Sequence, residues 1–548
     1  MIFGSSALFA ALLPLALFQE AAAQVDTPSI QPVELSLEML ARALPEGSVP
    51  DTPILIPAIE VRRQLIYQFG RAELESRKLD VFINDEINSQ LAAGVPPEQF
   101  GIPKSEIDAA IAETLEKVKE QYPDLKPEAV LQINGVDTRN LPSLTRQSKL
   151  FDLVFLPDNP NDWPPLTTEA LMERMGEEFV SQTKSSYEGR SALEAEQTPE
   201  ERAQAQGSLG MFNHLIRTQV RAALNDAATI ETASNGLPAE IVMRVNGTDV
   251  LTEELFEQVS SKLTESDVAE VEALLIKNKL VEQALRAKDA WLEGEEWEMA
   301  WESHVEENAN SIFPLETIAV LLRGFPSLEI YSEYYRLASS FERMVSADIT
   351  DETLGKHVDE RAGHIINLAE VESEIILISA FDFPNNRWIE GGWEAAGEEA
   401  LAVVDELAAM EGKNWDELLV KHSDFWDPPA PTTPVAQDPA QQKRKNKGRF
   451  GRRNRNTLLQ MLGESDFTTY LRGSSIVDEI FFHMEAGEVG GPFLGEHGYY
   501  IVRVLDRTPP RSTRDLRDED FKTMVLQDFV TDGLTKFADD LYQAAVSG

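Results

Sequence analysis

Apolar residues recur at intervals of three to four positions along most of the chain, a spacing that predicts amphipathic helices. The pattern runs through residues 58–121, where Pro123 and Pro127 end it, and returns at 268–291 and 327–344. Residues 24–56 are rich in proline, so we expect a linker there, with a short helix near 35–44.

Two short β-branched runs interrupt the helical pattern, and each is followed by Asn-Gly. The first is Val130–Ile133 and the second is Ile241–Val245. Asn-Gly closes tight turns because both residues tolerate positive φ. The sequence therefore predicts a strand and turn at each place, and the two copies suggest a weak two-fold internal repeat.

The pattern changes after residue 349. A continuous apolar run at 374–378 predicts a buried strand, and helical spacing at 400–408 and 415–423 predicts two helices. Strand-like alternation returns at 498–507. The fold class we expect is α+β and mostly α, with helical modules followed by a small α/β domain and a C-terminal helix at about 515–545.

Length, charge and cysteine content narrow the function classes. The 548 residues predict three or four domains, and the formal net charge of -45 argues against a nucleic-acid or anionic-membrane partner. The chain has no cysteine, which excludes disulfides, thiolate metal sites and a cysteine nucleophile.

The first residues resemble an export signal. An apolar run from 2 to 18 precedes Ala21, Ala22 and Ala23, which offer a small-residue cleavage site. An uncleaved anchor is the alternative, but Pro14 and Glu20 shorten the run below the ~20 residues of a spanning helix. We expect cleavage, a location in the periplasm or cell envelope, and no transmembrane segment in the mature chain.

Four sequence motifs of the second half are Ile349–Glu352 (ITDE), Trp415–Ser423 (WDELLVKHS), Gly487–Phe493 (GEVGGPF) and Gly498–Arg507 (GYYIVRVLDR). In this order they resemble motifs of parvulin-type (PpiC) peptidyl-prolyl isomerase domains within SurA/PrsA-like envelope foldases. The resemblance covers about 145 residues well, and residues 231–348 resemble the helical chaperone module of SurA-type proteins more loosely.

The resemblance implies a domain plan. Residues 1–23 would be the signal peptide, 24–230 a helical region with one short hairpin, and 231–348 the chaperone module. A parvulin-like domain would occupy 349–510, with a proline-rich and basic insertion at 427–456. The last part, 511–548, would be a helix that packs back on the helical module.

The family's catalytic positions fall on residues that do not suit its chemistry. Its two histidines fall on Ile375 and Tyr500, and its Cys or Asp falls on Asp424 or Phe425. The isoleucine cannot form hydrogen bonds, so strong catalysis is not expected. The peptide-binding positions that the resemblance implies are Val477, Phe482, Phe493 and Tyr500.

No cofactor and no metal are expected. His357 and His364 flank acidic residues, a pattern that a loose metal cluster or a solvated acidic helix can produce. The absence of a zinc-protease pattern favours the solvated acidic helix.

The insertion carries a dense positive charge after its prolines. We expect an extended basic arm that binds an anionic envelope component or the chain's own acidic surface; a solvated loop is the alternative. Its cations are Lys443, Arg444, Lys445, Lys447, Arg449, Arg452, Arg453 and Arg455.

Together these features predict a periplasmic protein of the peptidyl-prolyl isomerase family that acts mainly as a folding chaperone for exported proteins, with weak or lost isomerase activity. Its partners would be unfolded or extended polypeptides. One alternative is an active isomerase with an atypical site, and another is a non-catalytic adaptor or structural protein of the envelope.

Overall fold

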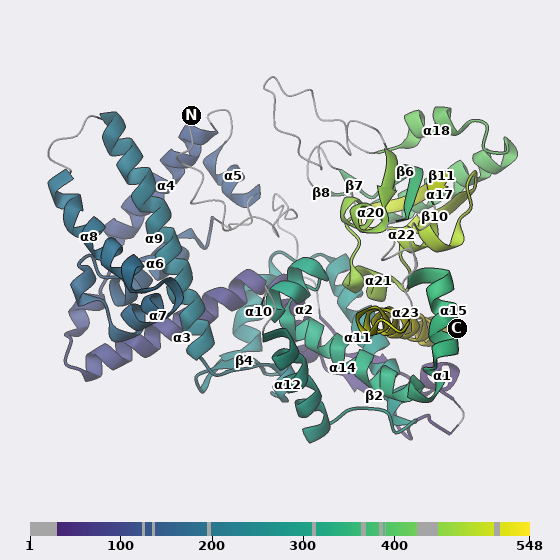
Figure 1. Ribbon diagram of the computed structural model, residues 1–548, viewed down its shortest axis with the longest axis horizontal. Helices are drawn as coiled ribbons and strands as arrows, with labels where there is room; N and C mark the ends of the chain where they lie inside the picture. The colour runs from purple at the N-terminus through teal and green to yellow at the C-terminus, as the bar shows by residue number, and fades with distance from the viewer. Residues whose placement is uncertain are drawn as a thin grey trace. The chain divides into compact units, whose positions relative to one another are not determined.

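The computed structural model describes residues 30–45, 47–122, 126–133, 138–193, 199–309, 314–362, 369–382, 387–389, 391–424, 448–508 and 516–547 (Figure 1). The expected signal peptide, Phe425 and most of the expected basic arm lie outside these residues. Helices dominate and the sheets are small and antiparallel, which confirms the predicted fold class. Within the described residues no helix is both long and apolar enough to cross a membrane.

The chain divides into two compact units. One contains residues 70–262, and the other combines residues 27–69 with 263–548. The second unit is therefore discontinuous in sequence, with the first unit inserted between its two parts. The domain boundaries expected from the resemblance stay a prediction.

The unit of residues 70–262 is mainly helical and ends in a three-stranded sheet, β3-β4-β5. Asn246 and Gly247 adopt φ of 50° and 81° in the turn between β4 and β5, as the Asn-Gly signal predicts. The elements are α3 (Arg71–Ala92), η2 (Pro97–Phe100), α4 (Lys104–Gln121), α5 (Pro127–Ile133), α6 (Leu141–Phe155), η3 (Pro160–Asp162), α7 (Pro165–Met175), α8 (Glu177–Leu193), α9 (Pro199–Ala227), β3 (Ile230–Glu231), η4 (Ala233–Asn235), β4 (Ile241–Val245), β5 (Thr248–Leu251) and α10 (Thr252–Ser260).

The strand predicted at Val130–Ile133 is wrong, because these residues belong to helix α5. Pro127 begins the helix, a position where its missing N–H is harmless. Val130 and Leu131 are buried against Val118 of α4, and this contact outweighs the β propensity of the local sequence. With the first strand lost, the two-fold repeat loses its basis.

The second unit has a helical body that gathers around the C-terminal helix. Helix α23 packs against α1, α11, α14 and α15, and the rings of Phe341 and Phe537 lie 5.5 Å apart where α14 meets it. The elements are β1 (Val33–Leu35), α1 (Leu37–Ala43), β2 (Ile54–Ile56), α2 (Ala58–Phe69), α11 (Glu265–Arg286), α12 (Glu295–Ala309), α13 (Leu315–Thr317), η5 (Ile318–Leu322), α14 (Leu328–Val345), η6 (Ser346–Asp348), α15 (Asp351–His357), η7 (Val358–Ala362) and α23 (Glu519–Val546).

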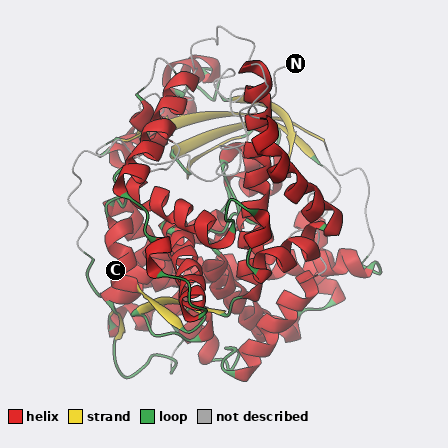
Figure 2. Ribbon diagram, turned by 90° about the vertical axis from the view of Figure 1, so that its left-hand side faces the viewer, coloured by secondary structure: helices red, strands yellow, loops and turns green. Residues whose placement is uncertain are grey.

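The same unit contains an α/β domain built on a four-stranded antiparallel sheet of order β10-β11-β6-β9, drawn in yellow with the other strands in Figure 2. Its elements are β6 (Glu370–Ser379), β7 (Phe381–Asp382), β8 (Arg387–Trp388), α17 (Gly392–Ala409), α18 (Trp415–His422), β9 (Arg449–Asn454), α20 (Arg455–Leu462), α21 (Asp466–Arg472), α22 (Ile476–Asp478), η8 (Glu479–His483), β10 (Val489–Leu494) and β11 (Gly498–Thr508).

Side chains of alternate residues in the central strands lie on opposite faces of this sheet. Ile376 and Ile378 pack with Trp415 and other side chains of α17 and α18, whereas Ile375 and Leu377 face the short helices that follow β9. The sheet is therefore covered on both faces, which explains why β6 is a continuous apolar run.

Candidate functional site

The two positions that the resemblance assigns to catalytic histidines lie on one face of the sheet. Tyr500 is paired with Leu377 and Val502 with Ile375, so the side chains of Ile375 and Tyr500 belong to neighbouring positions of β6 and β11. Ile375 is 0% exposed and Tyr500 is 3% exposed. Both residues are members of one closed hydrophobic core.

The expected peptide-binding residues join the same core. Val477 is fully buried in α22, and Phe482 and Phe493 pack against the cluster from its edge. The structure thus brings Val477, Phe482, Phe493 and Tyr500 together around Ile375. They pack in the interior between the sheet and α20–α22.

The hydroxyl of Tyr500 lies in a buried environment that favours its neutral form. Burial raises the pKa of its hydroxyl above the ordinary value, and the nearby Glu496 raises it further. The backbone turns closely over the ring at Gly495, where an added Cβ would overlap the aromatic carbons. The tyrosine is a packing residue in this arrangement.

Asp424, the other candidate acid, lies just after α18 and is exposed at the surface. Its Oδ2 accepts a hydrogen bond from the backbone N–H of Ser379 at 2.9 Å, and its own N–H donates to the carbonyl of Leu377 at 2.7 Å. Partial burial of the carboxyl raises its pKa above the ordinary value, and the hydrogen bond from the Ser379 N–H offsets only part of this rise. Its contacts are those of a residue that ties α18 to the end of β6.

A buried carboxylate that the sequence did not single out fixes α22. Glu464 accepts hydrogen bonds from the Ser475 hydroxyl at 2.7 Å and from the N–H groups of Ile476 and Val477, both at 3.0 Å. These are the free donors at the start of a helix. The glutamate therefore sets the position of Val477 in the core.

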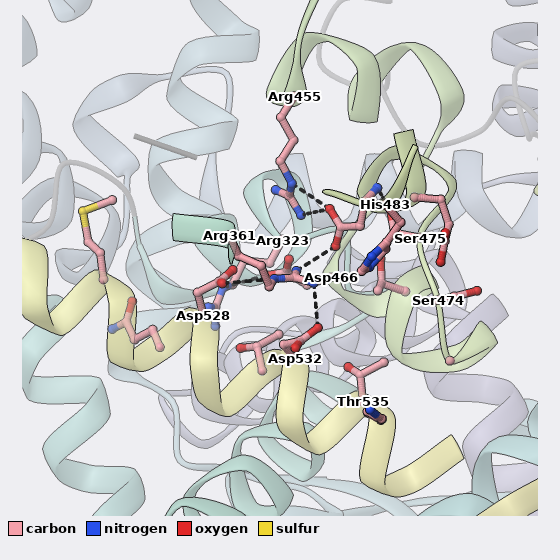
Figure 3. Close-up of a pocket in the computed structure, with 18 residues that line it drawn as sticks. Arg323, Arg361, Arg455, Asp466, Ser474, Ser475, His483, Asp528, Asp532 and Thr535 are labelled. Carbon is pink, nitrogen blue, oxygen red and sulfur yellow. Dashed lines mark hydrogen bonds and ion pairs between the residues drawn. The ribbon is translucent and has the colours of Figure 1, made fainter. Parts of the chain in front are cut away.

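A polar cleft of about 380 Å³ lies in the same unit, away from this core (Figure 3). One wall comes from α20, α21, α22 and η8 of the α/β domain, and the other comes from α23. Arg323, after η5, and Arg361, in η7, complete the lining. We call this space the polar cleft.

Arg361 is the centre of the charges in the polar cleft. Its guanidinium lies 2.9 Å from Asp478, 2.8 Å from Asp532 and 3.4 Å from Asp528. Arg455 pairs with Asp478 at 2.7 Å. Figure 3 shows Arg455 reaching in from the α/β domain while the two aspartates of α23 point toward Arg361. The network thus joins the α/β domain to the helical body.

His357 contacts this network through Asp528. Its Nε2 lies 2.6 Å from Oδ2 of Asp528, and the residue is 7% exposed. The hypothesis of a solvated acidic helix is therefore wrong for this histidine, while His364 lies outside the described residues. Burial acts to raise the pKa of Asp528, but the hydrogen bond to His357 and the charge of Arg361 outweigh it and lower the pKa.

Ser475 and His483 both line the polar cleft and are residue types that hydrolases use. The hydroxyl of Ser475 is already engaged, because it donates to Glu464 and accepts from the N–H of Asp478 at 3.2 Å. A nucleophilic serine needs a base as its partner. This serine instead begins α22 as its N-cap.

The prediction of an extended arm is wrong for the last four of its eight cations. Arg449, Arg452 and Arg453 lie in strand β9, which pairs with β6, and Arg455 begins α20. Arg449 lies 2.9 Å from Asp416, and Arg452 pairs with Asp506 of β11. Lys443, Arg444, Lys445 and Lys447 lie outside the described residues.

No family model matches the chain, and no curated protein matches it. Among solved structures it is similar to the peptidylprolyl isomerase PrsA of Bacillus cereus, with 12% identity over 56% of this chain and 91% of that one and a TM-score of 0.19.

Two further solved structures have the same degree of likeness. PrsA of Bacillus anthracis is 11% identical over 50% of this chain and 96% of that one, with a TM-score of 0.20. PrsA of Bacillus subtilis is 14% identical over 56% and 92%, with a TM-score of 0.15. At TM-scores of this size the likeness carries no argument about the activity of this chain.

Proposed function

We propose that this protein is an exported folding factor that binds unfolded or extended polypeptides, and that its α/β domain is a parvulin-type domain without effective prolyl isomerase activity. The observation that carries the second part is the closed core around Ile375 and Tyr500. The first part follows from the resemblance of the sequence and from the expected export signal.

The closed core bears directly on catalysis. Rotation about the prolyl bond has a barrier of ~18–20 kcal/mol, and an enzyme lowers it by binding the twisted amide more tightly than the planar one. Such binding needs a cavity for the proline ring. Ile375 and Val477 are 0% exposed and Tyr500 is 3% exposed, so these side chains offer almost no accessible surface to a proline ring.

Polypeptide binding is supported by apolar side chains on the surface of the helical body. Leu321 and Leu322 at the end of η5 are 54% and 64% exposed, and Met299 of α12 is 63% exposed. Exposed apolar surface of this kind is used for contact with other chains. The strong net negative charge keeps such a protein soluble while these side chains face water.

The catalytic part is tested with a protease-coupled assay on an X-Pro peptide. We expect the full chain to leave the rate at its uncatalysed value, whereas an active parvulin at the same concentration accelerates it. Tyr500→Phe is the matched control, because it keeps the ring and removes the hydroxyl. Turnover by the wild type that this variant abolishes would establish the alternative of an active isomerase with an atypical site.

The binding part is tested by light scattering from a β-barrel protein diluted out of denaturant. We expect the full chain to suppress aggregation near one molecule per client. An acidic protein of similar net charge serves as the control for non-specific charge effects. If the chain gives no more suppression than this control, the protein is an adaptor or structural protein and the proposed chaperone function is wrong.

A further inference from the structure

Helix α12 packs against α14 in the helical body, and a histidine takes part in the contact (Figure 1). At the start of α12, Glu296 pairs with Arg343 of α14 at 2.7 Å. Further along, the ring of Trp301 packs on the aromatic rings of α14, and Nε2 of His304 lies 2.9 Å from the hydroxyl of Tyr331. A titratable side chain therefore helps to hold the later part of α12 on α14.

The hydroxyl of Tyr331 determines which protonation state of His304 fits the contact. Arg323 donates to this hydroxyl at 3.0 Å, and a guanidinium can only donate. Burial raises the pKa of Tyr331, so the hydroxyl keeps its hydrogen, and we assign this hydrogen to Nε2 of His304. The ring is then neutral. A protonated ring would instead bring a second donor and a second positive charge to the oxygen that already accepts from Arg323.

The groups around His304 favour the neutral ring on balance. Burial and the charge of Arg323 lower its pKa, whereas Glu307 of the same helix acts in the opposite direction. Tyr335 of α14 stacks on the ring at 4.0 Å, and an aromatic face attracts a cation. Asp466 of α21 pairs with Arg323 at 3.3 Å and compensates part of its charge. The pKa of His304 stays below its ordinary value in spite of these opposing groups.

Helix α12 depends on its packing because its own charges destabilise it. The helix contains six glutamates and no lysine or arginine. Glu298, Glu302 and Glu306 follow one another at intervals of four residues, a spacing at which like charges repel. The loss of the contact at His304 would therefore act on a helix that has little stability of its own.

We propose that His304 is a pH-sensitive switch that holds α12 over the aromatic side chains of α14 while it is neutral and releases the later part of the helix when it is protonated. Release uncovers the rings of Tyr331 and Tyr335. Arg323, which contacts Tyr331, directly follows the exposed Leu322, so the uncovered rings extend the apolar surface assigned to polypeptide binding. This last step rests on the proposed function, whereas the switch itself does not.

The direction of the pH dependence follows from the lowered pKa of His304. In the released helix the ring has its ordinary pKa of ~6.5, so the contact has its full strength above that pH and weakens as the pH falls toward the lower pKa of the packed state. Amide hydrogen exchange in α12 of the full chain, corrected for the intrinsic rate at each pH, measures the opening of the helix. We expect opening to be several-fold more frequent at about pH 5 than at about pH 7.5.

Two variants and a matched control separate the switch from general effects of acid. His304→Gln removes the titration, so the opening of α12 should differ little between the two pH values. Tyr331→Phe keeps the ring but removes the hydroxyl that contacts His304, and α12 should open more often than in the wild type at about pH 7.5. Tyr335→Phe removes a hydroxyl from the same helix and should keep the pH response of the wild type. Equal opening of the wild type at both pH values, or a full pH response in His304→Gln, overturns the switch.

The effect on polypeptide binding is measured separately, by light scattering from the denatured β-barrel client. At about pH 5 the wild type should suppress aggregation more strongly than His304→Gln does at the same pH. Equal suppression by the two proteins, with α12 open in the wild type, would show that the switch does not control the binding surface. If neither protein suppresses aggregation at either pH, the proposed function fails, and the exchange measurement still decides whether the switch exists.

Discussion

The ion-pair network at Arg361 makes a quantitative prediction about the second unit. Replacement by glutamine, Arg361→Gln, keeps much of the side-chain length but removes the charge that faces three carboxylates. Breaking a buried ion pair from one side costs ~3–5 kcal/mol because the remaining charge stays buried without a partner. Asp478 and Asp528 are 11% and 18% exposed, so they stay desolvated in the variant.

Two features make the expected loss of stability smaller than this cost. Asp478 keeps Arg455 as a partner and Asp528 keeps His357, while Asp532 is exposed enough to be solvated by water. The stacking of Arg361 over the ring of Phe482, at 4.7 Å, is lost as well and adds a smaller amount. We therefore expect a loss of about 2–3 kcal/mol, just below the range for a buried pair that keeps no other partner.

The assay is amide hydrogen exchange in α23, since local exchange reports the free energy of opening of that helix even where the two units unfold separately. Lys413→Gln is the control, because Lys413 and its partner Glu411 are 73% and 80% exposed and their pair should contribute less than about 0.5 kcal/mol. If Arg361→Gln lowers the opening free energy no more than this control does, the network does not hold the α/β domain to α23.

Three further outcomes are expected. Lys277→Met should lower the free energy of unfolding in urea by about 2–3 kcal/mol. The buried ammonium of Lys277 donates hydrogen bonds to two carbonyls at the end of α21, and these carbonyls lose their partner in the variant. A change below about 1 kcal/mol would contradict this reasoning. Gly533→Ala should lower the melting temperature, because the added Cβ would lie 2.9 Å from the ring of Phe341 and this overpacking outweighs the helix-propensity gain of ~1 kcal/mol. Gly355→Ala should raise the melting temperature, because there is open space around Gly355. Because the folded-state pKa of Asp528 is lowered, its contribution to stability is full above the unfolded pKa of about 4 and is lost as pH falls through the folded value. In thermal unfolding, Asp528→Asn should therefore cost more stability at pH 7 than at pH 2, and an equal effect at both pH values would refute the assignment.

The sequence predicted the elements whose signals are local. Asn246 and Gly247 turn the β4–β5 hairpin, as expected from the residue types alone. The apolar run of β6 was recognisable because both faces of the sheet are covered. In each case the decisive interactions lie within a few residues of the signal.

The elements that were mispredicted depend on partners far away in the sequence. Val130 belongs to a helix because it packs on α4, and Arg452 belongs to a strand because β6 supplies its partner strand. The environment of His357 is set by Asp528, 171 residues later. The polar cleft could not be predicted for the same reason, since its lining comes from several separate segments that only the folded chain brings together.

The discontinuity of the second unit has a consequence for the order in which the chain acquires its structure. Helix α1 packs against α23, and Arg42 donates a hydrogen bond to the carbonyl of Ala545, 503 residues later. Helix α1, the first helix of the described residues, therefore cannot complete this packing until α23 has been synthesised. Residues 70–262 can fold during that interval, but the unit that contains the polar cleft is completed only once α23 is present.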